Sequence, residues 1–193
     1  LGTFAGRLMG RRLRYVTADS DPLHLHALRN RFLRTPQITV AELNAANTAD
    51  YLRFESEFDS AITINVLEGL EKPEDAMAGI HHALKPGGKL FLLAPQGRSL
   101  YGTVDRAMGQ LRRFDRAQLE TLLTQSGFDI ESVTDLNRAG HPAWWFAGKV
   151  LKRQQLSKVP LKIFDKTVWL WRLLDHVLPW KGLSMLIVAV KRG

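Results

Sequence analysis

The chain has 193 residues, which is enough for one domain of ordinary size and too few for two. Apolar residues make up 45% and charged residues 24%, which excludes an intrinsically disordered chain, a collagen-like repeat and a coiled coil. Cysteine is absent, so disulfides, zinc fingers and thiol nucleophiles are excluded too. The net charge of +8 favours anionic partners or, equally, a solvated basic surface that keeps the protein soluble.

No secretory or membrane-spanning segment is predicted. The most apolar stretches, residues 90–95 and 183–190, are far shorter than the ~20 residues that cross a bilayer. The expected location is therefore cytoplasmic, and association with a membrane surface is left open.

The first half of the chain alternates apolar runs with one helical pattern. Residues 14–18 predict a strand, and the helix that follows has Asp21 as its N-cap and Pro22 at its first position. Residues 38–43 predict the next strand. After a polar stretch, residues 61–67 form a nearly continuous apolar run, typical of a strand that is buried on both faces.

The second half continues the alternation. A helix begins at residue 72 with acidic residues in its first turn, and residues 89–94 predict another buried strand. Asp115 and Gln118 predict a capping box for a helix that Gly127 ends. Strands follow at 128–133 and 184–190, and the Trp- and Lys-rich segment 144–180 between them is expected to be mostly helical. The pattern predicts one α/β domain with a mostly parallel sheet and helices on both faces.

The carboxyl ends of the strands are where an open α/β sheet binds its ligands. Asp19 ends its strand roughly 20 residues after the turn that contains Gly2, a spacing that holds a ribose diol in nucleotide-binding folds. An ionised carboxylate suits this role because it can accept hydrogen bonds from both hydroxyls. The alternative role for Asp19 is to cap the next helix. Because Asp21 is better placed for that, the acceptors of Asp19 are expected to be free.

Three runs, YVTADSDP (15–22), FDSAITINVLEGL (58–70) and ALKPGGKLFLLAP (83–95), resemble the class I S-adenosylmethionine-dependent methyltransferases. This resemblance covers residues 1 to about 93. Residues 100–105, 112–114 and 144–145 resemble a bacterial subgroup of that family that is sometimes fused to sugar transferases. The resemblance implies a Rossmann-like fold of 1–193 with one antiparallel C-terminal strand, 184–190 beside 89–94. It also implies methyl transfer, with S-adenosylmethionine as the cofactor.

The resemblance assigns the cofactor-binding residues one by one. Gly2 would be the last glycine of the Gly-rich first motif. Asp19 with Ser20 would bind the ribose of the cofactor, and Asn65 would form the floor beneath its methionine part. Asn44 would accept from the adenine amino group, and Ala45 would offer its backbone to the ring. The family's first strand and the earlier glycines of that motif are not in this sequence. The slot between strands 14–18 and 61–66 is therefore expected to be empty or filled by a neighbouring molecule.

The sequence departs from the family at three positions. Gly69 stands where a His is common, Asn44 stands where an Asp is common, and Gln110 stands where the subgroup often has a His. Asn44 keeps an acceptor but carries no charge, and any role of the histidine that Gly69 replaces is absent here.

Residues 97–183 are expected to form the acceptor side of the site. The residues expected to contact the acceptor are Tyr101, Asp105, Arg112 and Arg113. Tyr101, Asp105 and His141 are candidates for a general base, and none of them is assigned. The expected acceptor is a small or lipid-linked molecule, and the two arginines would suit an anionic one.

Three other function classes stay open at this point. The chain could be a non-catalytic or truncated methyltransferase-fold binding module, or a nicotinamide-dependent oxidoreductase. A nucleic-acid partner is disfavoured because no RNA-binding motif occurs. The tryptophans and lysines of 144–180 suit either core packing or a membrane surface.

No metal site is expected. His24 and His26, like His81 and His82, are spaced so that they do not share a helix face.

Overall fold

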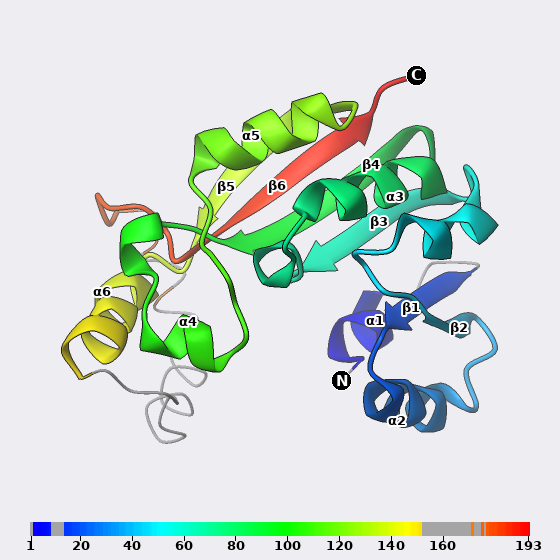
Figure 1. Cartoon of the computed structure of the whole chain (residues 1–193), viewed down its shortest axis with the longest axis horizontal. Helices are drawn as coiled ribbons and strands as arrows, with labels where there is room; N and C mark the ends of the chain where they lie inside the picture. Colours follow the sequence, from blue (N-terminus) through cyan, green and yellow to red (C-terminus); the bar gives the residue numbers. More distant parts are fainter. Residues whose placement is uncertain (1, 9–13, 152–170, 172–174, 176) are drawn as a thin grey trace.

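The computed structural model describes residues 2–8, 14–151, 171, 175 and 177–193. Helices and strands alternate along the chain (Figure 1). In order they are α1 (Thr3–Leu8), β1 (Tyr15–Asp19), α2 (Pro22–Phe32), β2 (Ile38–Glu42), η2 (Thr48–Phe54), β3 (Phe58–Ile64), η3 (Leu67–Gly69), α3 (Pro73–Ala83), β4 (Leu84–Pro95), η4 (Arg98–Leu100), α4 (Thr103–Ala107), α5 (Arg116–Gln125), β5 (Phe128–Leu136), α6 (Gly140–Trp145), η5 (Phe146–Val150) and β6 (Ser184–Lys191).

The strands form two sheets. β1 pairs with β2 in parallel, and the second sheet has the order β3-β4-β6-β5. β3 and β4 are parallel, whereas β6 is antiparallel to both of its neighbours, with Lys89 opposite Val190. The predicted antiparallel strand beside 89–94 is therefore confirmed, and so is the mostly parallel α/β fold.

The main core lies on one face of the four-stranded sheet. α3 and α5 cover this face in Figure 1, and they contribute Met77, Leu119 and Leu123 to a single buried cluster. β4 and β6 supply alternate residues to the same cluster, as expected where only one face is fully packed. Burial of these apolar side chains stabilises the sheet at about 25 cal/mol per Å².

β1 and β3 are not paired with each other, although each has an edge directed toward the other sheet. Within the described residues, β1 pairs with β2 alone and β3 with β4 alone. The predicted slot between them is thus present. The prediction that this strand is buried on both faces is wrong. β3 is half-buried or exposed along its length except at Thr63, which is buried. A strand with a free edge on a cleft cannot be covered on all sides.

Short-range features of the sequence explain how α2 begins and how α1 packs against it. The Asp21 side chain accepts a hydrogen bond from the Leu23 N–H, which makes it the N-cap of α2 as predicted. Gly2 has a φ of 68°, and a Cβ there would lie 2.8 Å from the Phe32 ring. Gly2 therefore lets the start of α1 pack closely against the end of α2.

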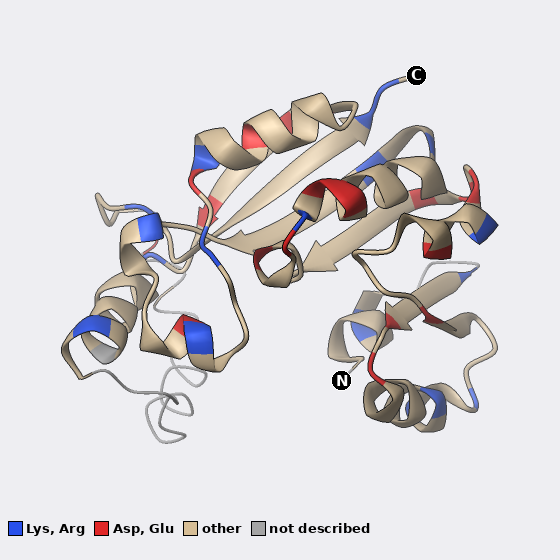
Figure 2. Cartoon of the chain, in the orientation of Figure 1, with Lys and Arg blue, Asp and Glu red and all other residues tan. Residues whose placement is uncertain are grey.

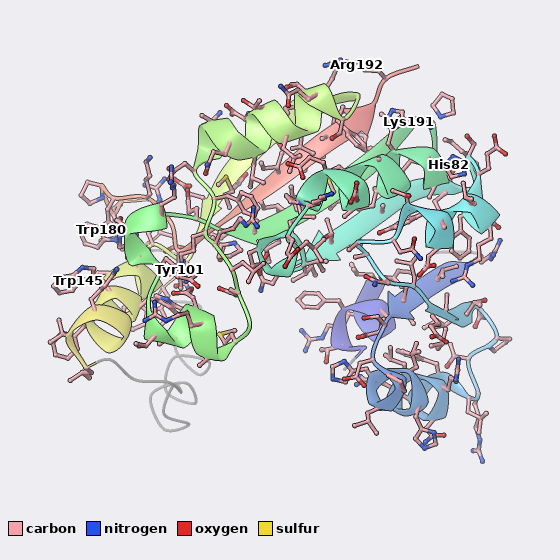
Figure 3. All side chains as sticks on the ribbon, viewed as in Figure 1. His82, Tyr101, Trp145, Trp180, Lys191 and Arg192 are labelled. Atoms are coloured by element: carbon pink, nitrogen blue, oxygen red, sulfur yellow. The ribbon has the colours of Figure 1, made fainter. Side chains whose placement is uncertain are left out.

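The Trp- and Lys-rich segment is described only in part. α6 and the π-helical turn η5 are helical as predicted, and Figure 3 shows Trp145 and Trp180 on the side of the molecule opposite Arg192. Lys152, Arg153, Lys158, Lys162 and Trp169 lie outside the described residues. Among the helices that are described, none combines the length and apolarity required to cross a membrane.

Candidate functional site

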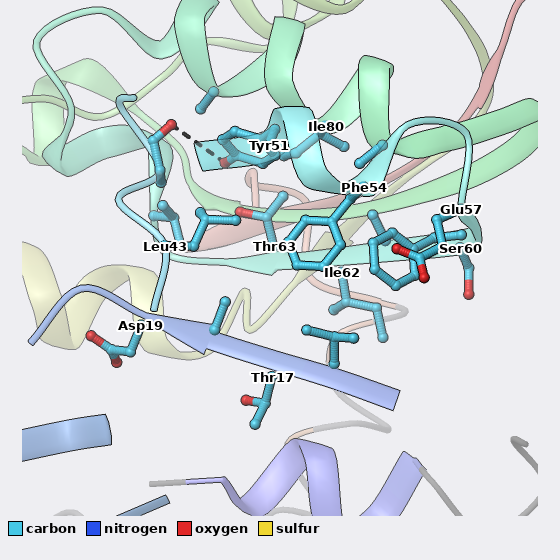
Figure 4. Close-up of a pocket in the computed structure, with 18 of the residues that line it drawn as sticks. Thr17, Asp19, Leu43, Tyr51, Phe54, Glu57, Ser60, Ile62, Thr63 and Ile80 are labelled. Atoms are coloured by element: carbon cyan, nitrogen blue, oxygen red, sulfur yellow. Dashed lines mark hydrogen bonds between the residues drawn. The ribbon is translucent and has the colours of Figure 1, made fainter. Parts of the chain in front are cut away.

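A cleft of about 810 Å³ separates β1 from β3 (Figure 4). Its long walls are the strand residues from Tyr15 to Asp19 and from Phe58 to Thr63. Its mouth, at the carboxyl ends of β1 and β2, is lined by residues that include Asp19, Ser20, Asn44, Ala45 and Val66. Four of the six residues predicted to bind the cofactor therefore line one cleft. Gly2 and Asn65 are not among its lining residues.

Asp19 ends β1 with its carboxylate half-buried at this mouth. Its Oδ1 accepts from the Asp21 N–H at 3.0 Å, and its Oδ2 lies 3.2 Å from His24 Nδ1. The expectation that its acceptors are free is therefore wrong, because both oxygens already have one partner inside the chain. Each carboxylate oxygen has a second lone pair, so the group keeps capacity to accept from a ligand.

Asn44 and Ala45 follow β2 directly. The Asn44 Oδ1 accepts from the Ala46 N–H at 3.0 Å, an Asx turn that aligns this loop. Asp50 holds the loop from the other side by accepting from the Asn44 N–H at 2.8 Å. The Tyr51 hydroxyl donates to the Ala45 carbonyl at 3.4 Å, and burial raises the pKa of Tyr51 to about 12, so this donor keeps its proton.

Asn65 follows β3 in a left-handed conformation, with a φ of 51°. Its N–H donates to the Leu93 carbonyl at 2.9 Å, which continues the ladder between β3 and β4 by one residue. A non-glycine residue at positive φ is uncommon and concentrates at functional sites and turns. Here it turns the chain from β3 into η3 at the carboxyl edge of the sheet.

In the segment predicted to contact the acceptor, Asp105 and Arg113 are buried together. The Arg113 Nε donates to Asp105 Oδ1 at 2.7 Å, and the Arg113 Nη1 donates to the carbonyls of Gln96 and Leu183. The guanidinium also lies over the Trp144 ring, 4.8 Å from its centroid. Burial lowers the pKa of Arg113, and the Asp105 carboxylate opposes this shift.

The other predicted acceptor residues also contact the protein itself. The Tyr101 hydroxyl donates to the Gln110 carbonyl at 3.0 Å, and the Arg112 Nη2 donates to the Leu70 carbonyl at 3.0 Å. His141 Nδ1 lies 3.0 Å from the Lys181 carbonyl oxygen. Contact of Tyr101, Asp105, Arg112 and Arg113 with an acceptor stays a prediction, and their present partners make them framework residues as well.

Sequence reasoning missed one buried polar residue near this framework. Glu68 is 1% exposed, and Gln110 donates to it from a segment 42 residues away. Gln96, also buried, donates to Asp135 Oδ1 at 2.5 Å. The signal available in the sequence was Glu68 itself, a carboxylic acid between the apolar residues Val66, Leu67 and Leu70.

The charged residues of the rest of the molecule are not gathered on one element. Figure 2 shows Lys and Arg on α2, α4, α5 and the C-terminal end, with Asp and Glu interspersed. Among the residues that the structure describes, no group of three His, Asp or Glu side chains converges as metal ligands.

Comparisons with known proteins point to one family. Residues 1–90 match the family model described as a methyltransferase domain. A comparison with curated proteins finds no match. Among solved structures, the [4+2]-cyclase SpnF aligns with a TM-score of 0.65 and 17% identity, over 99% of this chain and 71% of its own.

Two methyltransferase structures align with somewhat lower TM-scores. A putative sarcosine dimethylglycine methyltransferase from Galdieria sulphuraria gives a TM-score of 0.62 with 13% identity, over 97% of this chain and 74% of its own. A putative methyltransferase from Bacillus halodurans C-125 gives 0.58 with 16% identity, over 92% of this chain and 83% of its own. At these identities the structures show a shared fold. With the match of residues 1–90 to a methyltransferase domain, they show that this chain has the Rossmann-like fold of the methyltransferases.

Proposed function

We propose that the chain binds S-adenosylmethionine at the mouth of the cleft between β1 and β3 and transfers its methyl group to a small or lipid-linked acceptor. The observation that carries this proposal is the meeting of Asp19, Ser20, Asn44 and Ala45 along one cleft. They come from two parallel strands whose carboxyl ends lie side by side, with Asp19 opposite Glu42 in register. Such an edge is where open α/β sheets bind nucleotides.

The residues present fit the cofactor. Asp19 has lone pairs left for ribose hydroxyls, because each of its oxygens has only one partner within the described residues. The Asx turn at Asn44 orients the Ala45 backbone beside the same mouth. Val66 and Leu67 add apolar surface to the lining, as an adenine ring requires.

The cofactor supplies an activated methyl group, so the protein needs no covalent intermediate. This chain's residues would align donor and acceptor and exclude water, which can account for a large share of a displacement's acceleration. Asp19 would fix the ribose, and the turn at Asn65 would set the floor below the reacting end. Within the described chain, the acceptor would approach from the segment that contains Tyr101 and α4.

The acceptor class is proposed from the residues around that segment. Arg112 and Arg113 favour an anionic acceptor, in keeping with the net charge of +8. Since Arg113 is buried against Asp105, Arg112 is the better placed of the two for a solvent-exposed acceptor. Tyr101 and His141 are the proposed sources of a general base where the acceptor is a hydroxyl, because Asp105 is buried in its pair with Arg113.

A binding module without catalysis is the second candidate. What favours it is that, within the described residues, no strand pairs with the cleft-facing edges of β1 and β3. The same fold in SpnF, a [4+2]-cyclase, also shows that this architecture serves more than one chemistry.

Calorimetric titration with S-adenosylmethionine, S-adenosylhomocysteine and NAD separates these functions. The proposal expects saturable binding of the first two ligands and none of NAD. Binding of NAD alone would indicate an oxidoreductase. If neither sulfur ligand binds at millimolar concentration while the protein stays folded, the cofactor proposal fails and the binding module stands.

A further inference from the structure

Glu68 and Gln110 meet in the interior, between the turn that follows β3 and the segment that follows α4. The Gln110 Nε2 donates to Glu68 Oε1 at 3.4 Å. Within the described part of the chain, the other two oxygens of this pair, Glu68 Oε2 and Gln110 Oε1, are buried and have no hydrogen-bond partner. Such orphaned acceptors are rare and call for an explanation.

One proton would satisfy both oxygens. An ionised carboxylate and an amide carbonyl only accept hydrogen bonds, so they have nothing to offer each other. A protonated carboxyl has an O–H donor, and a carboxylic acid beside a primary amide can form two antiparallel hydrogen bonds. The existing bond from Gln110 Nε2 would be one of them. The second would run from Glu68 Oε2 to Gln110 Oε1.

The charges around Glu68 favour the neutral form. Arg113 is the cation that faces it, from the segment after α4, and Arg113 is already paired with Asp105 of α4 at 2.7 Å. One arginine therefore faces two carboxyl groups, and a neutral Glu68 leaves the cluster balanced. Burial raises the pKa of Glu68 to about 7, against the lowering effects of its own backbone hydrogen bond and of Arg113.

The pair lies at a seam between the two sides of the proposed site. The Leu111 N–H donates to the Glu68 carbonyl at 2.8 Å, and the Arg112 Nη2 donates to the Leu70 and Glu71 carbonyls at 3.0 and 3.1 Å. Residues 110–112 therefore lie along residues 68–71. Because Leu67 and Leu70 also line the cleft, the seam joins the acceptor-side segment to the cleft wall.

We propose that Glu68 is held as a neutral carboxylic acid whose proton bridges to the Gln110 amide, forming a pH-sensitive clasp between the turn after β3 and the segment after α4. The clasp does not depend on which acceptor the protein uses. Losing its proton leaves a buried charge facing an acceptor oxygen, so the segment at 110–112 loosens from the turn at 68–71.

The direction of the pH effect follows from linkage. A carboxyl whose folded-state pKa lies above its ordinary value of 4.5 contributes stability that is fully present below about pH 4.5 and is lost as the pH rises to about 7. Glu68→Gln cannot titrate and keeps a two-bond amide pair. The unfolding constant of the wild type divided by that of Glu68→Gln should therefore rise by about tenfold per pH unit between roughly pH 5 and 6.5 and level off above 7.

The experiment is urea unfolding of the full chain from pH 5 to 8.5, with Glu71→Gln as the matched control. Glu71 lies three residues further on, has an exposed side chain, and should keep the wild-type pH dependence. The double variant Glu68→Gln/Gln110→Glu exchanges the two groups and should restore the pH dependence that Glu68→Gln removes. Parallel pH profiles for wild type and Glu68→Gln would overturn the proposal.

Infrared spectroscopy tests for the same proton in the wild-type protein, so it needs no substitution that could disturb folding. The glutamates are labelled with ¹³C. At pH 6 the labelled sample should show a protonated carboxyl band that titrates near pH 7, while exposed glutamates are ionised. A spectrum with only carboxylate bands at pH 6 would also overturn the clasp. These measurements do not depend on cofactor binding. If they contradict the clasp, the proposed methyl transfer is unaffected. If the calorimetric titration finds no cofactor binding, the proposed clasp is unaffected.

Discussion

Asp105 and Arg113 form an ion pair with almost no solvent contact. The Arg113 Nε lies 2.7 Å from Asp105 Oδ1, and the side chains of Arg113 and Asp105 are 1% and 0% exposed. The pair is completed by the Gly102 N–H, which donates to Asp105 Oδ2 at 2.8 Å. It holds α4 against β4 and the loop before β6, because Arg113 also bonds the Gln96 and Leu183 carbonyls. The segment that we propose for the acceptor is thus held by a buried charge pair.

Breaking this pair should cost stability. Arg113→Ala leaves the Asp105 carboxylate buried without its cation, so the free energy of unfolding should fall by about 3–5 kcal/mol. Urea unfolding at neutral pH measures it. Arg116→Ala is the matched control, because its ion pair with Glu120 is exposed and should contribute about 0.5 kcal/mol or less. Equal losses in the two variants would contradict a framework role for Arg113.

Asp19→Ala should weaken S-adenosylmethionine binding by about tenfold to several-hundredfold, because hydrogen bonds to a charged acceptor are worth about 1.5–3 kcal/mol each. Asp19→Asn should cost less. Asp21→Ala is the matched control: each alanine variant loses a bond to the start of α2, worth about 1 kcal/mol of stability, but of the two only Asp19 lines the cleft. Calorimetric affinity is measured beside thermal melting. Unchanged affinity in Asp19→Ala with a lowered melting temperature would make Asp19 purely structural.

A substitution at Asn65 can distinguish a role in the backbone turn from a contact with the cofactor. Asn65→Gly fits the φ of 51° without strain, so folding stability should be kept or rise slightly. If the Asn65 side chain supports the methionine part of the cofactor, the same variant should bind S-adenosylmethionine about tenfold more weakly, the loss of about one hydrogen bond. Ser56→Gly, at a φ of 48° and before the amino end of β3, does not change a residue that lines the cleft and should leave affinity unchanged. Wild-type affinity in Asn65→Gly would remove Asn65 from the site.

Gly79 should tolerate no side chain. A Cβ there would lie 2.3 Å from the Tyr51 ring, where α3 packs on η2, so Gly79→Ala should lower the free energy of unfolding by about 1–3 kcal/mol. Gly6→Ala, also in a helix, would meet nothing closer than 3.8 Å and should be neutral or stabilising by up to about 1 kcal/mol. Chemical denaturation compares the two. A Gly79→Ala protein as stable as Gly6→Ala would mean that Tyr51 moves aside at no cost.

Much of the framework follows from signals confined to a few neighbouring residues. Asp21 and Pro22 start α2, Pro73 with the acidic residues after it starts α3, and the Gln118 side chain accepts from the Asp115 N–H at the start of α5. The apolar runs at 89–94 and 184–190 predicted strands that are present. Caps and short apolar runs act within one or two turns, so they are visible in the order of residues alone.

The tertiary structure decided how the polar groups are used. Asp19 pairs with His24 and the Asp21 N–H, and β3 is left half-buried because its edge borders the cleft. The Glu68–Gln110 pair and the burial of Arg113 on Asp105 depend on segments that meet only when the sheet and its loops assemble. A carboxylate, amide or guanidinium has the same formula whether it meets a ligand or a distant part of its own chain. Its partner is chosen by packing, and that is a property of the whole fold.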